Sequence, residues 1–248
     1  MLRIAGRGRG NRSRPALACI LLLIVVSGSC CEPAQSRAAK PAKPPVLLMF
    51  HCGGFIFGCP SPCMPYAQAL GVLYGFEPRV IDYPLGSVPE AMRAAVAAVP
   101  PNRRTYAYGE SAGGLLAARL AQRGSVRAAA VQSPVANLPY YLRLIQPGSP
   151  FTISTLLGVP TLAEQKCYSP AHNRTRHPVF ATAAFDDALT PATLRWARKA
   201  RRVLAVTVAG DHLDSTGVLY PSRVQFLLGW LACQAGTLVC SNPDLRPR

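Results

Sequence analysis

Tyr108-Gly109-Glu110-Ser111-Ala112-Gly113-Gly114 is the stretch of sequence that decides the fold. It follows a short apolar run at residues 105–109 and opens an alanine- and leucine-rich stretch with the composition of a helix. When a strand turns at once into a helix, side chains two before and two after the serine collide, which explains Gly109 and Gly113. The pattern predicts a sharp turn that exposes the Ser111 hydroxyl at a helix N-terminus, where amide groups favour negative charge.

Short apolar runs with little polar alternation recur on both sides of this turn. Such runs are typical of parallel strands that are buried on both faces. We expect strands at residues 46–51, 79–83, 105–109, 128–132, 179–185 and 203–209. Helical stretches lie among them, at residues 65–74, 90–99, 111–122, 192–200 and 218–233. This alternation predicts an α/β fold, with a mostly parallel sheet of about six strands and helices on both faces.

The 248 residues suffice for one sizeable domain, which we place at residues 46–240. Residues 137–169 break the alternation, and we expect them to form a small lid or cap over the sheet. Residues 31–45 are rich in proline, alanine and charge and are predicted to be a linker. Residues 241–248 are expected to be a tail.

The N-terminal segment, residues 1–30, has the order of a secretory signal. Five arginines within the first fourteen residues precede the apolar run Ala16–Val26, and small residues follow it. The apolar run is short for a membrane span, so a signal peptide is the preferred interpretation, with an uncleaved membrane anchor as the alternative. Lipidation at Cys30 or Cys31 is disfavoured because no leucine precedes them in the lipoprotein pattern. The chain is therefore predicted to be exported, whether secreted, periplasmic or anchored in the envelope.

The formal net charge is +16, and the chain beyond residue 30 keeps 22 of the 27 basic residues against all 11 acidic ones. The densest basic cluster falls at residues 195–202, along one predicted helix and its exit. Nucleic-acid binding would require interleaved aromatic residues or a known binding module, and neither is present. The cluster is interpreted as a solvated helix face, with no nucleic-acid partner expected.

Six cysteines lie within the predicted domain, beyond the signal and the linker, and an even number in an exported chain indicates disulfides. Cys233 and Cys240 are close enough in sequence for a local bridge that ties the tail to the last helix. Cys59 and Cys63, taken with His51, match no known zinc spacing, so no metal site is predicted.

A serine hydroxyl needs a neighbouring base to act as a nucleophile. Where a reactive serine stands on such a turn, the partners follow in the order serine, acid, histidine. Of the later histidines, His212 comes just after the last predicted strand and can reach Ser111. His172 and His177 precede a strand and are interpreted as loop or capping residues.

The acid is expected just after the strand at residues 179–185, where Asp186 and Asp187 both stand. We favour Asp187 because it begins an Asp-Ala-Leu-Thr-Pro segment, while Asp186 remains the alternative. Asp211 and Asp214 flank His212 too closely to orient its ring and are assigned to the shape of the loop.

Negative charge that develops on a bound carbonyl oxygen requires backbone donors around it. His51-Cys52-Gly53-Gly54-Phe55 follows the first predicted strand, so the amides of Gly53, Gly54 and Ala112 are predicted to form this oxyanion hole. His51 precedes the serine and ends a strand, which favours a structural role over that of a base.

These segments together resemble the hormone-sensitive-lipase-like esterases. Residues 51–58 resemble their HGGGF-x-x-G segment, Asp82-Tyr83-Pro84-Leu85 is similar to their DYRL segment, and Gly109–Gly114 matches their GDSAGG turn with one acidic exchange. Asp187-Ala188-Leu189 is similar to their acid segment. The resemblance implies the α/β-hydrolase fold and hydrolysis of small-molecule or lipid carboxylic esters through an acyl-enzyme, without metal or organic cofactor.

Two departures from that pattern stand out. Cys52 replaces the first glycine of the trio, so its position must accept a side chain. Little sequence precedes Val46, so a shortened sheet and an open site are expected. Two other functions stay open: acyl transfer by the same three residues, and a catalytically silent binding protein on this fold.

Overall fold

The computed structural model describes residues 43–57, 64–147, 150–212 and 220–240. The predicted signal or anchor, the linker up to residue 42, Cys59, Cys63, Asp214 and the tail lie outside the described residues. Within the described ranges, none of the helices has the length and apolarity that crossing a bilayer requires.

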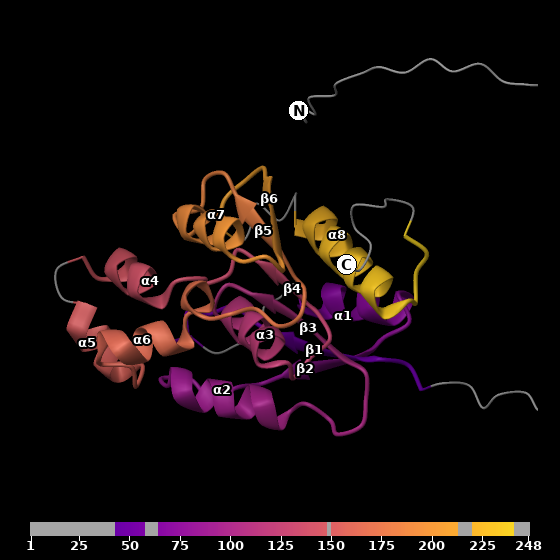
Figure 1. The fold of residues 1–248 in the computed structure, drawn as a ribbon, viewed down its shortest axis with the longest axis horizontal. Helices are drawn as coiled ribbons and strands as arrows, with labels where there is room; N and C mark the ends of the chain where they lie inside the picture. The colour runs from indigo at the N-terminus through magenta and orange to yellow at the C-terminus, as the bar shows by residue number, and fades with distance from the viewer. Residues whose placement is uncertain (1–42, 58–63, 148–149, 213–219, 241–248) are drawn as a thin grey trace, which may run out of the picture. The chain divides into compact units, whose positions relative to one another are not determined.

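The described chain builds one six-stranded sheet in which every neighbouring pair of strands is parallel (Figure 1). The strand order is β2-β1-β3-β4-β5-β6. The strands are β1 (Val46–Phe50), β2 (Glu77–Ile81), β3 (Thr105–Glu110), β4 (Ala129–Gln132), β5 (Val179–Ala184) and β6 (Val203–Val208). The predicted α/β class, the strand number and the parallel sheet are confirmed.

Strand β2 begins and ends two residues earlier than predicted, at Glu77 instead of Arg79. Proline lacks an amide hydrogen and is disfavoured inside a sheet. In the structure β2 is an edge strand, and Pro78 pairs in register with Leu47 of β1. An edge strand tolerates proline because one of its sides needs no hydrogen-bond partner.

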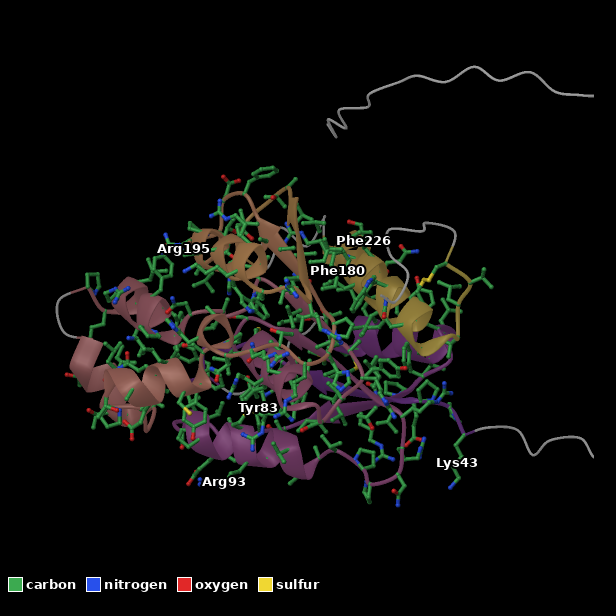
Figure 2. The ribbon with its side chains drawn as sticks, viewed as in Figure 1. Lys43, Tyr83, Arg93, Phe180, Arg195 and Phe226 are labelled. Atoms are coloured by element: carbon green, nitrogen blue, oxygen red, sulfur yellow. A yellow bond between two sulfur atoms is a disulfide. The ribbon has the colours of Figure 1, made fainter. Side chains whose placement is uncertain are left out.

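Helices cover both faces of the sheet (Figure 1). Helices α1 (Met64–Leu73) and α8 (Tyr220–Ala235) pack on one face, and α2 (Val88–Ala97), α3 (Ala112–Arg123) and α7 (Thr190–Lys199) pack on the other. Alternate strand residues serve the two cores: Leu47 packs with α1 and α8, and Leu48 with α2 and α3. Figure 2 shows Phe180 of β5 beside Phe226 of α8, with ring centroids 5.1 Å apart.

Three helices and a short 3₁₀ turn lie between β4 and β5, in and just after the predicted insertion. They are α4 (Leu138–Ile145), α5 (Pro150–Leu156), α6 (Leu162–Tyr168) and η1 (Pro170–His172). The Asn137 side chain starts α4 by accepting the Tyr140 amide at 3.1 Å. Thr161 and Glu164 start α6 with a reciprocal capping box. The role of this insertion as a lid stays a prediction.

The local disulfide expected from the sequence joins Cys233 to Cys240, whose Cα atoms lie 5.4 Å apart. Cys233 belongs to α8, so the bridge ties the chain that leaves this helix back to its last turn.

Candidate active site

Ser111 stands on a strained turn between β3 and α3. Its φ of 52° lies in the left-handed region that non-glycine residues rarely adopt. The turn is held by the Ser111 amide, which donates to the Gln132 carbonyl of β4 at 2.9 Å. A Cβ atom on Gly109 would overlap the Gly113 carbonyl, and one on Gly113 would overlap the Phe50 carbonyl. The glycines are therefore required by close backbone approach, as the sequence predicted.

The structure brings Ser111, His212 and Asp187 together in one line. The Ser111 Oγ lies 2.8 Å from Nε2 of His212. On the other side of the ring, Nδ1 lies 2.9 Å from Oδ2 of Asp187. The three residues follow the carboxyl ends of β3, β6 and β5, which meet at one edge of a parallel sheet.

The Asp187 carboxylate is only 6% exposed and is held by several donors. Its Oδ1 accepts the Leu189 amide at 2.8 Å. Burial raises the pKa of this carboxyl, but the hydrogen bonds and charge of His212, with bonds from Leu189 and Ser133, outweigh burial. The pKa of Asp187 therefore lies below its usual value, and the group is an anion at neutral pH.

Its neighbour Asp186 is exposed, and its backbone amide donates to the Gly210 carbonyl at 3.1 Å. Successive residues leaving a strand point to different sides. The side chain that faces His212 is therefore that of Asp187, while Asp186 lies in the wall of the adjoining cavity.

His172 and His177 take no part in this cluster. His172 ends the η1 turn, and His177 lies just before β5, at the opposite edge of the sheet from Ser111. The pKa of each is lowered, first by burial and then by neighbouring lysines or arginines. Among the described residues, no three His, Cys, Asp or Glu side chains gather closely enough to hold a metal ion.

The segment after β1 holds two of the residues predicted to form the oxyanion hole. Gly53 and Gly54 have φ values of +122° and +63°, which glycine adopts without strain. The Gly113 amide donates to the His51 carbonyl at 3.1 Å, which ties this loop to the start of α3. Within the described residues, the Gly53 and Gly54 amides donate no hydrogen bond. Ala112 is the first residue of α3, so its amide has no acceptor inside the helix.

Cys52 stands where the resembling esterases have the first glycine of their trio. Its φ is not positive, in contrast to those of Gly53, Gly54 and Phe55. A side chain is therefore accepted at this position without backbone strain.

His51 is fully buried and supports the loop rather than reaching Ser111. Its ring stacks on Tyr83 with centroids 4.3 Å apart. The Tyr83 hydroxyl donates a hydrogen bond to the His51 carbonyl at 2.8 Å (Tyr83 is labelled in Figure 2). The histidine therefore has a structural place, in agreement with the interpretation from the sequence.

Two residues of the site were not predicted from the sequence. Tyr141 of α4 places its hydroxyl 3.4 Å from the Gly54 carbonyl, and a Cβ on Gly54 would lie 2.5 Å from that hydroxyl. Ser133, with a left-handed φ of 43°, helps to lower the pKa of the Asp187 carboxyl. Ser133 follows β4 and so lies at the same end of the strands as Ser111, Asp187 and His212, which is the one signal for it in the sequence.

A cavity of about 450 Å³ opens beside His212 and Asp187. Its apolar wall comes from α4 and from the loop after β5, and comprises Tyr141, Leu144, Ile145, Ala188 and Leu189. Asp186 and Asp211 complete the lining. The volume lies in the range of small-molecule sites, which are mostly apolar with a few placed polar groups.

Comparison with known proteins gives the same fold at low sequence identity. The Est2 esterase of Thermogutta terrifontis is 22% identical with a TM-score of 0.63, over 83% of this chain and 89% of that one. The EstE1 carboxylesterase from a metagenomic library is 23% identical with a TM-score of 0.61, over 81% and 82%. An esterase of Pyrobaculum calidifontis is 22% identical with a TM-score of 0.59, over 78% and 76%.

No protein-family model and no curated protein sequence matches the chain. The chain has the α/β-hydrolase fold that these esterases share.

Proposed function

We propose that this protein is a serine hydrolase that cleaves carboxylic esters through an acyl-enzyme. The observation that carries the proposal is the line from Ser111 Oγ through the His212 ring to Asp187, with hydrogen-bond distances of 2.8 and 2.9 Å. Nucleophile, base and orienting acid in contact are what covalent catalysis by serine requires.

In the first half-reaction, His212 Nε2 takes the proton of the Ser111 hydroxyl as Oγ attacks the ester carbonyl carbon. Asp187 holds the proton on Nδ1 and stabilises the imidazolium that forms. The amides of Gly53, Gly54 and Ala112 stabilise the oxyanion of the tetrahedral intermediate. The intermediate then expels the alcohol, which leaves with the proton from Nε2, and the acyl group stays on Oγ.

In the second half-reaction, water replaces the alcohol. His212 removes one proton from the water, and the hydroxide attacks the acyl carbon. Collapse of the second intermediate breaks the bond to Oγ, which regains its proton from His212. The products are a carboxylic acid and free Ser111. An added alcohol in place of water would give acyl transfer by the same steps.

The cavity supports esters with small, apolar acyl or alcohol groups. Leu144, Ile145 and Leu189 give it an apolar wall, and its volume of about 450 Å³ suits a small molecule. The Thermogutta esterase was described with propionate bound, which is a short carboxylate. We therefore propose short-chain esters as the substrates.

The test uses a fluorophosphonate probe, followed by mapping of the labelled residue, and hydrolysis of p-nitrophenyl butyrate. The wild type should be labelled at Ser111, and Ser111→Ala should lose both labelling and hydrolysis. Ser125→Ala is the matched control, because Ser125 lies at the other end of α3. A folded Ser111→Ala variant that keeps full hydrolysis would refute the mechanism, and an unlabelled, inactive wild type would favour a silent binding protein.

We also propose that the protein is exported. The order of five arginines, the apolar run Ala16–Val26 and small residues within residues 1–30 supports this. Cell fractionation and the intact mass of the product test it. Loss of roughly thirty N-terminal residues is expected of a cleaved signal. A full-length product in the cytoplasm would contradict export.

A further inference from the structure

A second cavity, of about 570 Å³, lies away from Ser111. Its lining comes from the last turns of α3, from residues 173–176 before β5, and from Arg202 just before β6. In a parallel sheet the amino ends of all strands lie on one side of the molecule and the carboxyl ends on the other. The cavity lies at the amino ends, whereas the proposed catalytic residues follow the carboxyl ends. This cavity is therefore separate from the proposed active site.

Arginine dominates the lining of this cavity, and no carboxylate contributes to it. The five arginines are Arg119, Arg123, Arg174, Arg176 and Arg202. Among the described residues, none of them forms an ion pair with an aspartate or glutamate. No carboxylate of the described residues therefore neutralises the positive charge around the cavity.

The positive charge affects His177, which lies at the same amino ends of the strands. The pKa of His177 is lowered, first by burial and then by the charges of Arg127, Arg202 and Arg176. Arginines that lower the pKa of a neighbouring histidine in this way create a positive electrostatic potential, which attracts anions.

Arg119 is the unusual member of the set, because it is only 8% exposed. Its Nη1 donates to Gln122 Oε1 at 2.8 Å, but its Nε has no hydrogen-bond partner among the described residues. Burial lowers the pKa of the guanidinium. A buried charge is costly unless an opposite charge and hydrogen bonds accompany it.

Gln122 fixes the orientation of Arg119. Its Nε2 donates to the carbonyls of Pro170 and Asn173 at 2.8 and 3.0 Å, so its Oε1 must point toward the guanidinium. The side chain of Arg119 is thus held in the cavity wall by a fixed amide rather than by a counter-ion. A buried guanidinium that is fixed in place but has no carboxylate partner among the described residues is suited to bind an anion.

We propose that this cavity binds a ligand through phosphate groups. Guanidinium groups are planar forks that match phosphate oxygens with paired hydrogen bonds. The volume of about 570 Å³ exceeds what a single small ion needs, which favours a pyrophosphate or a phosphate ester. No aromatic side chain lines the cavity, so the stacking surface that single-stranded nucleic acid uses is absent from the described lining.

The variant to test replaces two arginines whose side chains carry no hydrogen bond within the described residues. Arg123→Gln with Arg174→Gln removes two charges from exposed positions of the cavity. Arg195→Gln with Arg198→Gln removes two charges from the exposed face of α7 and is the matched control. Melting temperatures of both double variants establish that they are folded.

Calorimetric titration of the full chain with inorganic pyrophosphate measures binding of a soluble phosphate ligand. Sedimentation with vesicles of phosphatidylcholine, with and without phosphatidic acid, measures binding to a lipid phosphate headgroup. We expect saturable binding in at least one arm, weakened by about tenfold or more in the cavity variant, as loss of one charge-assisted hydrogen bond predicts. The α7 variant should bind as the wild type does. Equal weakening in the two variants, or no binding to pyrophosphate and to vesicles, would overturn the proposal.

Discussion

Replacing Asp187 by asparagine tests the geometry of the proposed active site at a single atom. The Oδ1 of Asp187 accepts the Leu189 amide, and the Oδ2 faces His212 Nδ1. An asparagine keeps the Leu189 bond only if its oxygen takes the place of Oδ1. Its amide nitrogen then faces Nδ1, and two donors cannot share that contact.

The ring must respond by moving its proton from Nδ1 to Nε2. Nε2 then donates to Ser111 Oγ, 2.8 Å away, instead of accepting its proton. The loss expected is about 10⁴-fold in turnover, as when asparagine replaces the aspartate of the serine-protease triad. That factor corresponds to about 5 kcal/mol of transition-state stabilisation.

The assay compares kcat and melting temperature for Asp187→Asn and Asp186→Asn with p-nitrophenyl butyrate under one condition. Asp186 is exposed, so its variant should stay within about threefold of the wild type, given the roughly 0.5 kcal/mol scale of exposed substitutions. The reasoning is refuted if Asp187→Asn remains active. If Asp186→Asn is at the same time inactive and folded, the acid must be reassigned by one residue.

Three further predictions concern the stability of the fold. Gly113→Ala should lower the free energy of unfolding in urea by at least about 2 kcal/mol, because its Cβ overlaps the Phe50 and His51 carbonyls. Gly229→Ala is the control and should not show this loss, since its Cβ lies 3.9 Å from its nearest neighbour. Equal losses of stability in the two variants would exclude the clash. Because the pKa of Asp187 is lowered on folding, its stabilising contribution is present above about pH 4 and is lost as the pH falls through the folded pKa. The urea midpoint of the wild type should therefore fall more steeply in acid than that of Asp187→Asn, and parallel curves would contradict this. Cys233→Ser should cost about 2 kcal/mol by opening the local bridge, while Cys167→Ser should leave the melting temperature unchanged, since Cys167 is an exposed free thiol.

Most of the fold could be predicted because its strands are buried on both faces. Such strands are short apolar runs, so β1, β3 and β5 stand out in the sequence within a residue of their observed ends. The serine turn was equally clear, because the collisions that require Gly109 and Gly113 are local. The start of β2 was missed because the tolerance of an edge strand for Pro78 depends on a strand order that the sequence does not display.

The parts of the site that escaped prediction depend on contacts between distant segments. Tyr141 reaches Gly54 across 87 positions of the chain, and nothing in its local sequence marks it. The arginine cavity is hidden in a similar way: Arg202 belongs to the basic cluster at residues 195–202, but Arg119 and Arg174 come from two other segments. Within that cluster, Arg195 and Arg198 are exposed on α7 and belong to a solvated helix face.

The proposed active site draws on two kinds of scaffold, and this division has a consequence for how the protein can change. Ser111, Asp187 and His212 lie at or just after the carboxyl ends of sheet strands, whereas much of the apolar cavity wall is supplied by α4 in the insertion between β4 and β5. Under the proposed function, the insertion supplies much of the surface that selects the ester, while the reacting groups come from the loops that follow the strands. Replacing the insertion would therefore change which ester enters, and it would also remove the contact of Tyr141 with Gly54.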